Sequence, residues 1–460
     1  MSDGAFERLR LGTDTLGQIT QRRGQVRALR AGMLEATLPG ATLGELVAVD
    51  IAGASYLFEV ADFSGIGVRL LPLEDHPPPR AGLAVEGLGY PLRARVPQTQ
   101  GLLLDALGRT FSGLPDDTVL TGPLGSRSGA LGTSARPALP SPLGLSVLQP
   151  PASALRRQLP KRPLATGIRV IDGFCTLAEG QRMGLFAGPG VGKTSLLTAL
   201  AKNSDADVFI IALIGERGWE LKAMLQDGFG GRIGSGYVLH APSSAPPLAK
   251  VRCAQTALTL AEGLAREGKR VLFLVDSLTR VARAARQTAI LLGEPAVQRG
   301  FPPSVFSILA DLIERAGAFS WGTITAIYTI LVEGSDHDEP IADESRALLD
   351  GHIILSRARF EAGIFPAVDP LRSLSRQMSF VTSEAYREVS HTLRRLLSRY
   401  EQDRDLLLLG NYQEGKDAEL DRAVALEPEI NRFLRQPTGE HTPIDLTYQG
   451  LARIVAASAR

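Results

Sequence analysis

The chain has 460 residues, of which 44% are hydrophobic and 22% charged, so it has enough apolar material for more than one core and a length typical of two to four domains. Its 50 basic and 49 acidic side chains nearly cancel, which removes whole-chain charge as a reason to expect binding to nucleic acid or to an anionic membrane. The two cysteines lie far apart without partners at metal-ligand spacing, which argues against a disulfide framework or a zinc site and favours a reducing cytoplasm.

The N-terminal part of the chain predicts a short segment and then a small β domain. Residues 1–17 contain no apolar stretch of signal-peptide length, and no apolar run elsewhere is long enough to span a bilayer. In residues 18–95, short apolar segments are separated by Gly, Asp and Pro at strand-and-turn spacing, which predicts a β-barrel or sandwich. Residues 96–163 are predicted to be a connector, whose Pro-, Gly- and Ser-rich stretch from 121 to 163 is extended and, in its first half, mobile.

The middle of the chain, residues 164–379, predicts a parallel sheet covered by helices on both faces. Five apolar runs alternate with stretches of helix length: MGLFA, VFIIALI, YVLHA, VLFLV and TITAIYTIL. Residues 380–460 contain no further strand pattern. There Val389, Leu393, Leu396, Leu397 and Tyr400 recur at spacings of three and four, which predicts an amphipathic helix and a small helical domain.

The stretch AGPGVGKTS, residues 187–195, resembles a phosphate-binding loop in which Ala187 replaces the first glycine. Glycines let backbone N–H groups turn inward, and the following helix N-terminus adds a dipole that favours phosphate. The predicted nucleotide-binding residues are Gly188, Pro189, Gly190, Val191, Gly192, Lys193, Thr194 and Ser195. Lys193 is expected to reach the β and γ phosphates and Thr194 to bind Mg²⁺. The alternative is a glycine-rich turn that binds nothing.

Charged residues follow two of the predicted strands. Asp276 ends the run VLFLVD, where its carboxylate is expected to hold the water shell of Mg²⁺; the alternative is that it caps the helix beginning near Leu278. Glu216 and Arg217 follow the run VFIIALIG, as a carboxylate that could polarise the attacking water and a cation that could steady phosphate charge. Alternatively, Glu216 only complements a helix dipole.

These segments together resemble the export ATPases of flagellar and other type III secretion systems, relatives of the catalytic subunits of rotary ATP synthases. The resemblance rests on "PLATGIRVIDGFCTLAEGQRMGLFAGPGVGKT", "IGERG", "VLFLVDSLTR", "PPSVF", "EPIADE", "FPAVDPLRSLSR" and "LLSRYEQDRDLLLLGNYQEGKDAELDRAVAL", which occur in the family's order over about residues 160–430. It implies a RecA-type ATPase core with an N-terminal β-barrel and a C-terminal helical domain. The cofactors it implies are ATP and Mg²⁺.

The resemblance also implies residue roles. Glu216 matches the family's water-activating glutamate, Arg217 and Arg280 match basic residues near the phosphates, and Phe365 falls where relatives place a tyrosine against adenine. Arg376 matches an arginine finger supplied to the neighbouring subunit of a homohexamer, worth about 10³ to 10⁵ in rate, or roughly 4 to 7 kcal/mol of barrier. The alternative for Arg376 is a solvated surface arginine.

The family's partners follow from the same resemblance. They are a stator-like regulator at the N-terminus, the membrane-embedded export gate, and substrate–chaperone complexes that contact the helical domain, for a cytoplasmic protein associated peripherally with the inner membrane. Two positions depart from the family pattern: Trp219 stands in place of a second arginine and Gln377 in place of an aliphatic residue. The resemblance leaves open whether the apparatus builds a flagellum or an injectisome.

Three other functions are compatible with a phosphate loop. A rotary ATP synthase subunit is disfavoured by the segments PPSVF and EPIADE, which are typical of the export branch. A Rho-type nucleic-acid translocase is disfavoured because residues 1–100 contain 10 Arg, no Lys, 11 acidic residues and five aromatics, so no nucleic-acid partner is expected. A nucleotide sensor that does not hydrolyse ATP is disfavoured by the combination of Lys193, Thr194, Glu216, Asp276 and Arg376.

Overall fold

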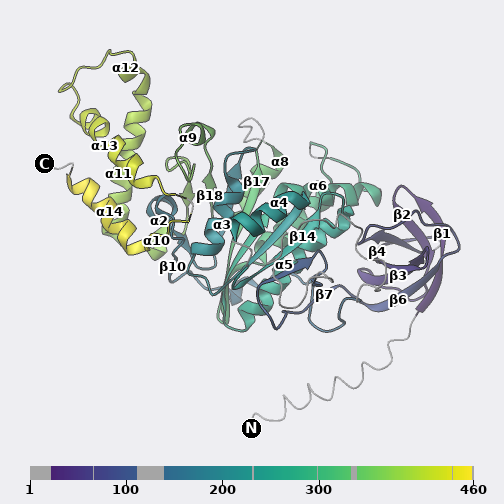
Figure 1. The fold of residues 1–460 in the computed structure, drawn as a ribbon. Coiled ribbons are helices and arrows are strands. Elements are labelled where there is room, and N and C mark those ends of the chain that lie inside the picture. The colour runs from purple at the N-terminus through teal and green to yellow at the C-terminus, as the bar shows by residue number, and fades with distance from the viewer. Residues whose placement is uncertain are drawn as a thin grey trace, which may run out of the picture.

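The computed structural model of the chain describes residues 22–65, 67–110, 139–229, 233–297, 299–332, 339–437 and 439–457. The predicted N-terminal segment, 1–17, and residues 121–138 of the predicted connector lie outside these ranges. Figure 1 shows a barrel at one end, a central sheet flanked by helices, and a group of helices at the other end. This arrangement confirms the predicted fold class. The boundaries drawn between the domains from composition stay predictions.

Six antiparallel strands close into the N-terminal barrel, in the order β1-β2-β5-β4-β3-β6. They are β1 (Arg22–Arg30), β2 (Met33–Thr37), β3 (Glu45–Ile51), β4 (Ala54–Ser64), β5 (Gly67–Pro72) and β6 (Ala84–Pro91). Val47 and Val49 of β3 fill the barrel, and the intervening Ala48 packs outward toward the central core, as the twofold strand period requires. Arg252 Nε donates to Glu59 Oε2 of β4 at 2.7 Å and thereby ties the barrel to the core.

The central sheet has nine strands, with the path β19-β18-β12-β17-β15-β13-β14-β8 and β16 paired to β17. The parallel strands are β8 (Leu102–Asp105), β12 (Arg182–Ala187), β13 (Val208–Glu216), β14 (Gly236–Pro242), β15 (Arg270–Asp276), β17 (Gly322–Leu331) and β18 (Gly351–Ile354). β16 (Gly317–Phe319) and β19 (Leu374–Ser375) run antiparallel to their neighbours. All five apolar runs named above lie in parallel strands. β8, from the stretch predicted to be connector, adds a further strand beside β14.

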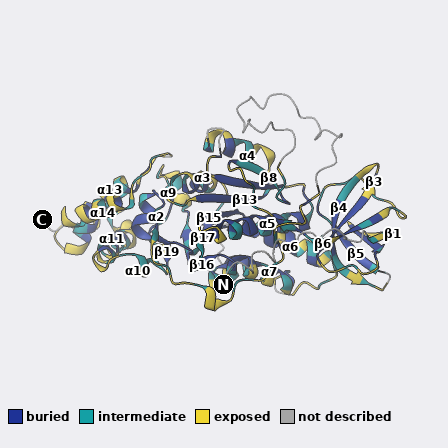
Figure 2. Ribbon diagram, turned by 90° about the horizontal axis from the view of Figure 1, so that it is seen from below, coloured by how far each residue is buried: buried dark blue, intermediate teal, exposed yellow. Residues whose placement is uncertain are grey.

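Alternate residues of each strand enter two cores, one on each face of the sheet. In β13, Ile210 and Ala212 belong to the core packed by α5, α6 and α7, whereas Ile211 and Leu213 belong to the core packed by α2, α3 and the C-terminal helices. Figure 2 shows these central strands in the buried colour. The helices are α2 (Arg169–Phe174), α3 (Lys193–Asn203), α5 (Pro247–Arg266), α6 (Leu278–Leu291) and α7 (Pro303–Glu314). Because both faces are covered, the carboxyl edge of the sheet is where functional side chains are expected to meet.

Shorter elements complete the central part. They are β7 (Arg93–Ala94), β9 (Leu145–Ser146), η2 (Ala154–Arg156), β10 (Pro163–Leu164), β11 (Leu177–Ala178), α4 (Gly218–Ala223), the π-helical turn η3 (Met224–Gly228), α8 (Pro340–Leu348) and α9 (Arg357–Glu361). β7 pairs with β9, and β10 pairs with β11.

The C-terminal end is helical, as predicted. It contains α10 (Met378–Val381), α11 (Glu384–Gln402), α12 (Arg404–Leu408), α13 (Ala418–Leu434) and α14 (Ile444–Ala457). Leu393, Leu396 and Leu397 of α11 are buried, and the predicted apolar face packs into the core shared with α2. The Asp417 carboxylate caps α13 by accepting from the N–H groups of Glu419 and Leu420.

Candidate active site

The glycine-rich loop lies between β12 and α3, at the carboxyl edge of the sheet. Gly190 and Gly192 have φ angles of 74° and 88°, in the left-handed region that side chains rarely adopt. Gly192 is the N-cap of α3, and no side chain caps this helix. Since the first N–H groups of a helix need acceptors and carry its positive dipole end, the loop and the start of α3 form a site suited to an anion.

Four charged side chains meet beside this loop. Lys193 Nζ lies 2.5 Å from Asp276 Oδ1 and 3.8 Å from Glu216 Oε1. Arg280 Nη1 forms an ion pair with Glu216 Oε1 at 2.9 Å. Glu216 and Asp276 are 7% and 1% exposed, so their negative charges are held by these two cations rather than by solvent. The structure thus brings together the lysine of the loop and carboxylates from the ends of two strands, β13 and β15.

The environment of Asp276 differs from that of a helix cap. Ser277, and not Asp276, is the N-cap of α6, since its hydroxyl accepts from the N–H of Arg280. Asp276 Oδ1 instead accepts from the hydroxyl of Thr329 on β17, at 3.0 Å. The carboxylate therefore faces Lys193 and the loop.

Two residues that the sequence analysis did not single out shape the surroundings of Glu216. His240 of β14 lies with Nε2 at 3.2 Å from the Glu216 carbonyl oxygen, and burial lowers the pKa of His240 to about 4, so the imidazole is neutral at neutral pH. Gly215 has φ 69°, and a Cβ there would lie 3.1 Å from Arg280 Cδ. Because Gly215 has no Cβ, the side chain of Arg280 can lie against its backbone and reach the Glu216 carboxylate.

A cavity of about 200 Å³ adjoins the loop on its other side. Its lining includes Gly192, Ser195, Phe360, Phe365 and Gln436. The ring of Phe365 is 43% exposed and meets Phe360 edge to face, with centroids 5.3 Å apart. Apolar and aromatic walls beside a phosphate-sized cradle suit a flat heterocycle such as a nucleotide base.

Gln436, which follows α13, joins the C-terminal helices to this cavity. Its backbone N–H donates to the Phe365 carbonyl at 2.7 Å, and its side-chain Oε1 accepts from the N–H of Arg169 at 2.8 Å. Its Nε2 donates to the carbonyls of Gly167 and Glu440 at 2.7 and 2.9 Å. Through its side chain and its backbone, Gln436 thus connects its own segment to residues 167–169 and to Phe365, which are far apart in sequence.

The other two predicted arginines are exposed, and within the described residues neither forms an ion pair with Glu216 or Asp276. Arg217 is exposed and is the N-cap residue of α4, and Trp219 in the first turn of that helix is 63% exposed. Arg376 follows β19, which runs antiparallel to β18, so it lies level with the start of β12. At about 3.3 Å per residue, the length of β12 alone separates that edge from the phosphate loop by roughly 17 Å.

A larger cavity, of about 450 Å³, lies between residues 94–100 and the C-terminal part of α5, and contains none of the predicted site residues. Among the residues that the structure describes there is no group of three or more His, Cys, Asp or Glu side chains that could hold a metal ion. The helices in the described ranges include none that is long and apolar enough to cross a membrane.

Two family models match the chain. Residues 167–375 match the nucleotide-binding domain of the ATP synthase alpha/beta family, and residues 382–453 match the C-terminal domain of the type III secretion ATPase EscN. The flagellum-specific ATP synthase of Treponema pallidum is 38% identical over 95% of this chain and 93% of its own length. The type 3 secretion system ATPase of Pseudomonas syringae pv. tomato is 41% identical over 94% of each chain.

This chain belongs to the flagellar and type III secretion ATPase family. Solved structures agree with that assignment. EscN of enteropathogenic Escherichia coli in its assembled form matches this export ATPase with a TM-score of 0.81 and 34% identity, over 94% of this chain and all of the EscN chain. EscN in complex with its central stalk EscO matches with a TM-score of 0.80 and 34% identity, over the same shares of the two chains.

The family assignment confirms the predicted resemblance and the predicted enzyme class, an ATPase of protein export. The roles given to individual residues of this export ATPase remain predictions. Lys193, Glu216, Asp276 and Arg280 lie together and Phe365 lines the adjoining cavity. Arg217 is exposed directly after Glu216, and Arg376 is exposed at the other edge of the sheet. Phe360, His240 and Gln436 were missed because no local motif marks them.

Proposed function

We propose that this export ATPase hydrolyses ATP with Mg²⁺ to energise protein export by a flagellar-type secretion apparatus, and that it works as a homohexamer with Arg376 supplied in trans. The observation that carries the proposal is the meeting of Lys193, Glu216, Asp276 and Arg280 beside an uncapped helix N-terminus. Such a centre can hold a triphosphate and also position the water that attacks it.

Lys193 is the residue that binds the outer phosphates. Its ammonium group is held between Asp276 and Glu216, at 2.5 and 3.8 Å, so it already points across the loop. Phosphate oxygens compete for this cation when ATP enters, because charge-assisted bonds to phosphate are strong. The base of the nucleotide then occupies the cavity lined by Phe360 and Phe365.

The oxygen donors beside the loop fit a magnesium ion. Thr194 presents a hydroxyl in the first turn of α3, and Asp276 presents a carboxylate whose orientation is fixed by Thr329. Hard oxygen donors of this kind, with several waters retained, are what Mg²⁺ prefers. When bound, the ion neutralises charge that develops between the β and γ phosphates.

Glu216 is the proposed general base or orienting group for water. Its carboxylate is paired with Arg280 at 2.9 Å, which limits its rotation. Arg217, the next residue, is exposed and stays a proposed contact to phosphate charge.

Arg376 is too far from its own phosphate loop to serve it, since the strand β12 separates the two by roughly 17 Å and an arginine side chain extends only about 7 Å. The exposure of Arg376 at the opposite edge of the sheet supports a role at the nucleotide of a neighbouring protomer. A ring of like subunits is further supported by the assembled state of EscN. We also propose that the protein binds a stalk- or stator-like regulator, the export gate and substrate–chaperone complexes, and that it is a cytoplasmic enzyme associated peripherally with the inner membrane. The complex of EscN with its central stalk EscO supports the proposed regulator.

The dependence of activity on protein concentration tests the ring. Specific ATPase activity of the wild-type protein should rise with concentration as rings assemble, whereas Arg376→Ala should stay at the level of unassembled protein, about 10³ to 10⁵ below the assembled wild type. Arg372→Ala, an exposed arginine on the same segment, is the matched control and should follow wild type. Activity that is independent of concentration, with Arg376→Ala equal to wild type, would overturn the proposal.

A further inference from the structure

The backbone of Arg376 is held by little regular structure. The preceding strand β19 is two residues long, lies at the edge of the sheet and pairs only with β18. The side chain of Arg376 makes no hydrogen bond or ion pair within the part of the chain that the structure describes. Its backbone N–H donates to the carbonyl of Asp350 at 2.9 Å. A strand this short contributes few ladder bonds, so other groups must hold the segment in place.

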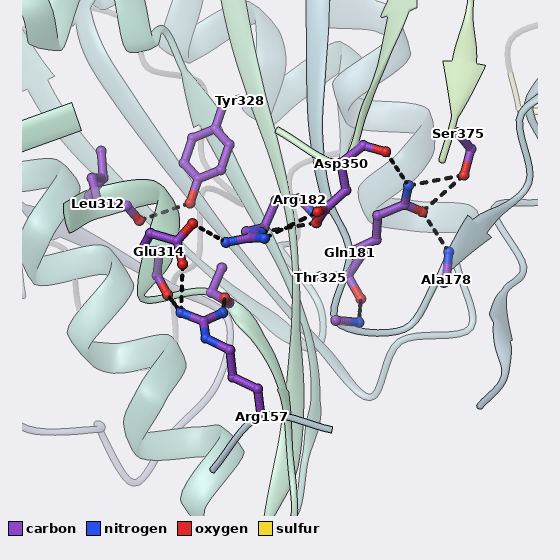
Figure 3. Close-up of polar contacts among 12 residues, drawn as sticks. Arg157, Ala178, Gln181, Arg182, Leu312, Glu314, Thr325, Tyr328, Asp350 and Ser375 are labelled. Carbon is purple, nitrogen blue, oxygen red and sulfur yellow. Dashed lines mark hydrogen bonds and ion pairs between the residues drawn. The ribbon is translucent and has the colours of Figure 1, made fainter. Parts of the chain in front are cut away.

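A buried glutamine supplies those bonds. Gln181, immediately before β12, has no exposed surface, and Figure 3 shows its amide between Ala178, Asp350 and Ser375. Nε2 donates to Ser375 Oγ at 3.0 Å and to the Asp350 carbonyl at 3.2 Å, and Oε1 accepts from the Ala178 N–H at 2.9 Å. The Ser375 hydroxyl in turn lies 3.2 Å from Oε1. The Gln181 amide thus holds Ser375, the residue before Arg376, and also the Asp350 carbonyl, which accepts a hydrogen bond from the Arg376 N–H.

Asp350 is itself fixed from the other side. Arg182, the first residue of β12, donates Nε and its backbone N–H to Asp350 Oδ2, each at 3.0 Å, and Nη2 to Oδ1 at 3.1 Å. The same guanidinium reaches Glu314 of α7 at 2.5 Å (Figure 3). The carbonyl that positions Arg376 is therefore anchored to the base of the strand that carries the phosphate loop.

We propose that Gln181 and Ser375 are positioning residues for Arg376, which hold its backbone so that the guanidinium is presented to the nucleotide of the neighbouring protomer. The inference rests on the proposed function, in which Arg376 acts in trans. Removing either side chain leaves the nucleotide site of the same protomer intact, because Lys193, Glu216 and Asp276 lie at the opposite edge of the sheet. It loosens the arginine, and a shift of about 1 Å in a catalytic group can cost about 10² in rate.

The variants Ser375→Ala and Gln181→Met remove the hydroxyl and the amide with little change in volume. Both are expected to lower the kcat of assembled protein by about tenfold to a hundredfold and to leave KM for ATP within about twofold of wild type. Ser373→Ala is the matched control. Ser373 is also buried on the same segment, but its hydroxyl bonds the Ile354 N–H and the Asp369 carbonyl instead, and this variant should retain wild-type kcat. Light scattering of each variant verifies that rings form.

Mixed rings separate a role in trans from a role in cis. Subunits of two variants are mixed before assembly, and the ATPase activity of the mixture is compared with that of each variant alone. Ser375→Ala mixed with Lys193→Ala should regain activity, because Lys193→Ala subunits supply a well-placed arginine to intact nucleotide sites. Ser375→Ala mixed with Arg376→Ala should regain none, since no subunit then presents a well-placed arginine.

Each outcome decides one proposal. Recovery with Arg376→Ala but not with Lys193→Ala would assign Ser375 to the nucleotide site of its own protomer and overturn the inference, as would a kcat of Ser375→Ala equal to that of Ser373→Ala. If Lys193→Ala and Arg376→Ala themselves fail to complement each other, the proposed arginine in trans is wrong. The two failures are therefore distinguishable in one set of mixtures.

Discussion

Replacing Gln436 with methionine tests how the C-terminal helices support the base cavity. The substitution keeps the side-chain volume but removes three hydrogen bonds, to the Arg169 N–H and to the carbonyls of Gly167 and Glu440. The two carbonyls retain other donors, since Thr442 N–H bonds Gly167 and Asn203 Nδ2 bonds Glu440. The N–H of Arg169, at the start of α2, loses its acceptor.

The magnitude follows from these three losses. An unsatisfied, largely buried N–H costs about 1–3 kcal/mol, and each of the other two bonds contributes about 0.5–1.5 kcal/mol, so the free energy of unfolding should fall by about 2–6 kcal/mol. The Gln436 backbone N–H, which the substitution keeps, bonds the Phe365 carbonyl. When the side chain no longer fixes this residue, Phe365 and the base cavity should become less rigid as well. KM for ATP should rise up to about tenfold, with kcat at saturating ATP within about twofold of wild type.

Denaturant unfolding and steady-state kinetics measure both effects on the full chain. Gln402→Met, at an exposed glutamine of α11, is the matched control and should change neither quantity. If Gln436→Met unfolded at the same denaturant concentration as Gln402→Met and kept its KM, Gln436 would not connect the helical domain to the cavity.

Two further predictions concern Glu216 and its neighbour. Glu216→Gln should lower ATP hydrolysis by at least about 10² because an amide cannot take up a proton, while a fluorescent ATP analogue still binds; hydrolysis equal to that of Glu220→Gln would exclude Glu216 as the base. Burial lowers the pKa of His240 from 6.5 to about 4, so the stability provided by its neutral form is complete above pH 6.5 and is lost as pH falls from 6.5 to 4, by about 3 kcal/mol in total. The unfolding free energy of wild type minus that of His240→Gln should fall by this amount over the same interval, a trend that the exposed-site variant His391→Gln should not show.

The parts of the site that could be predicted from the sequence are those encoded locally. The glycine spacing from Gly188 to Gly192 needs particular backbone angles, and Glu216 and Asp276 end apolar runs that are long enough to be recognised as strands. Parallel strands bring their carboxyl ends to one edge, so these residues meet without any knowledge of the connections. The helical face of α11 was predictable for the same reason, because its period lies within one segment.

The rest depends on contacts between distant segments. Gln436 bonds residues more than 260 positions away, and Gln181 bonds Ser375 across 194 positions, and neither glutamine lies in a pattern that indicates a role. β8 is only four residues long, and its place beside β14 is set by pairing rather than by its own sequence. Phe360 and His240 were missed because a single aromatic residue or histidine in an apolar surrounding resembles an ordinary core residue.

The separation of Lys193 and Arg376 on the sheet has a consequence for assembly. In the proposed ring each protomer presents a nucleotide site at one edge of its sheet and an arginine at the other, so the contact between neighbours is heterologous: one face of a subunit meets a different face of the next. A dimer formed through such a contact completes one site and leaves one arginine unused, and an open chain always retains one incomplete site at its end. Only a closed ring supplies an arginine finger to every bound ATP. Gln181 and Arg182 connect the Arg376 segment to the base of β12. A movement of the phosphate-loop strand in one subunit would therefore also move the arginine that this subunit presents to the next. In a closed ring, this connection would couple neighbouring nucleotide sites mechanically.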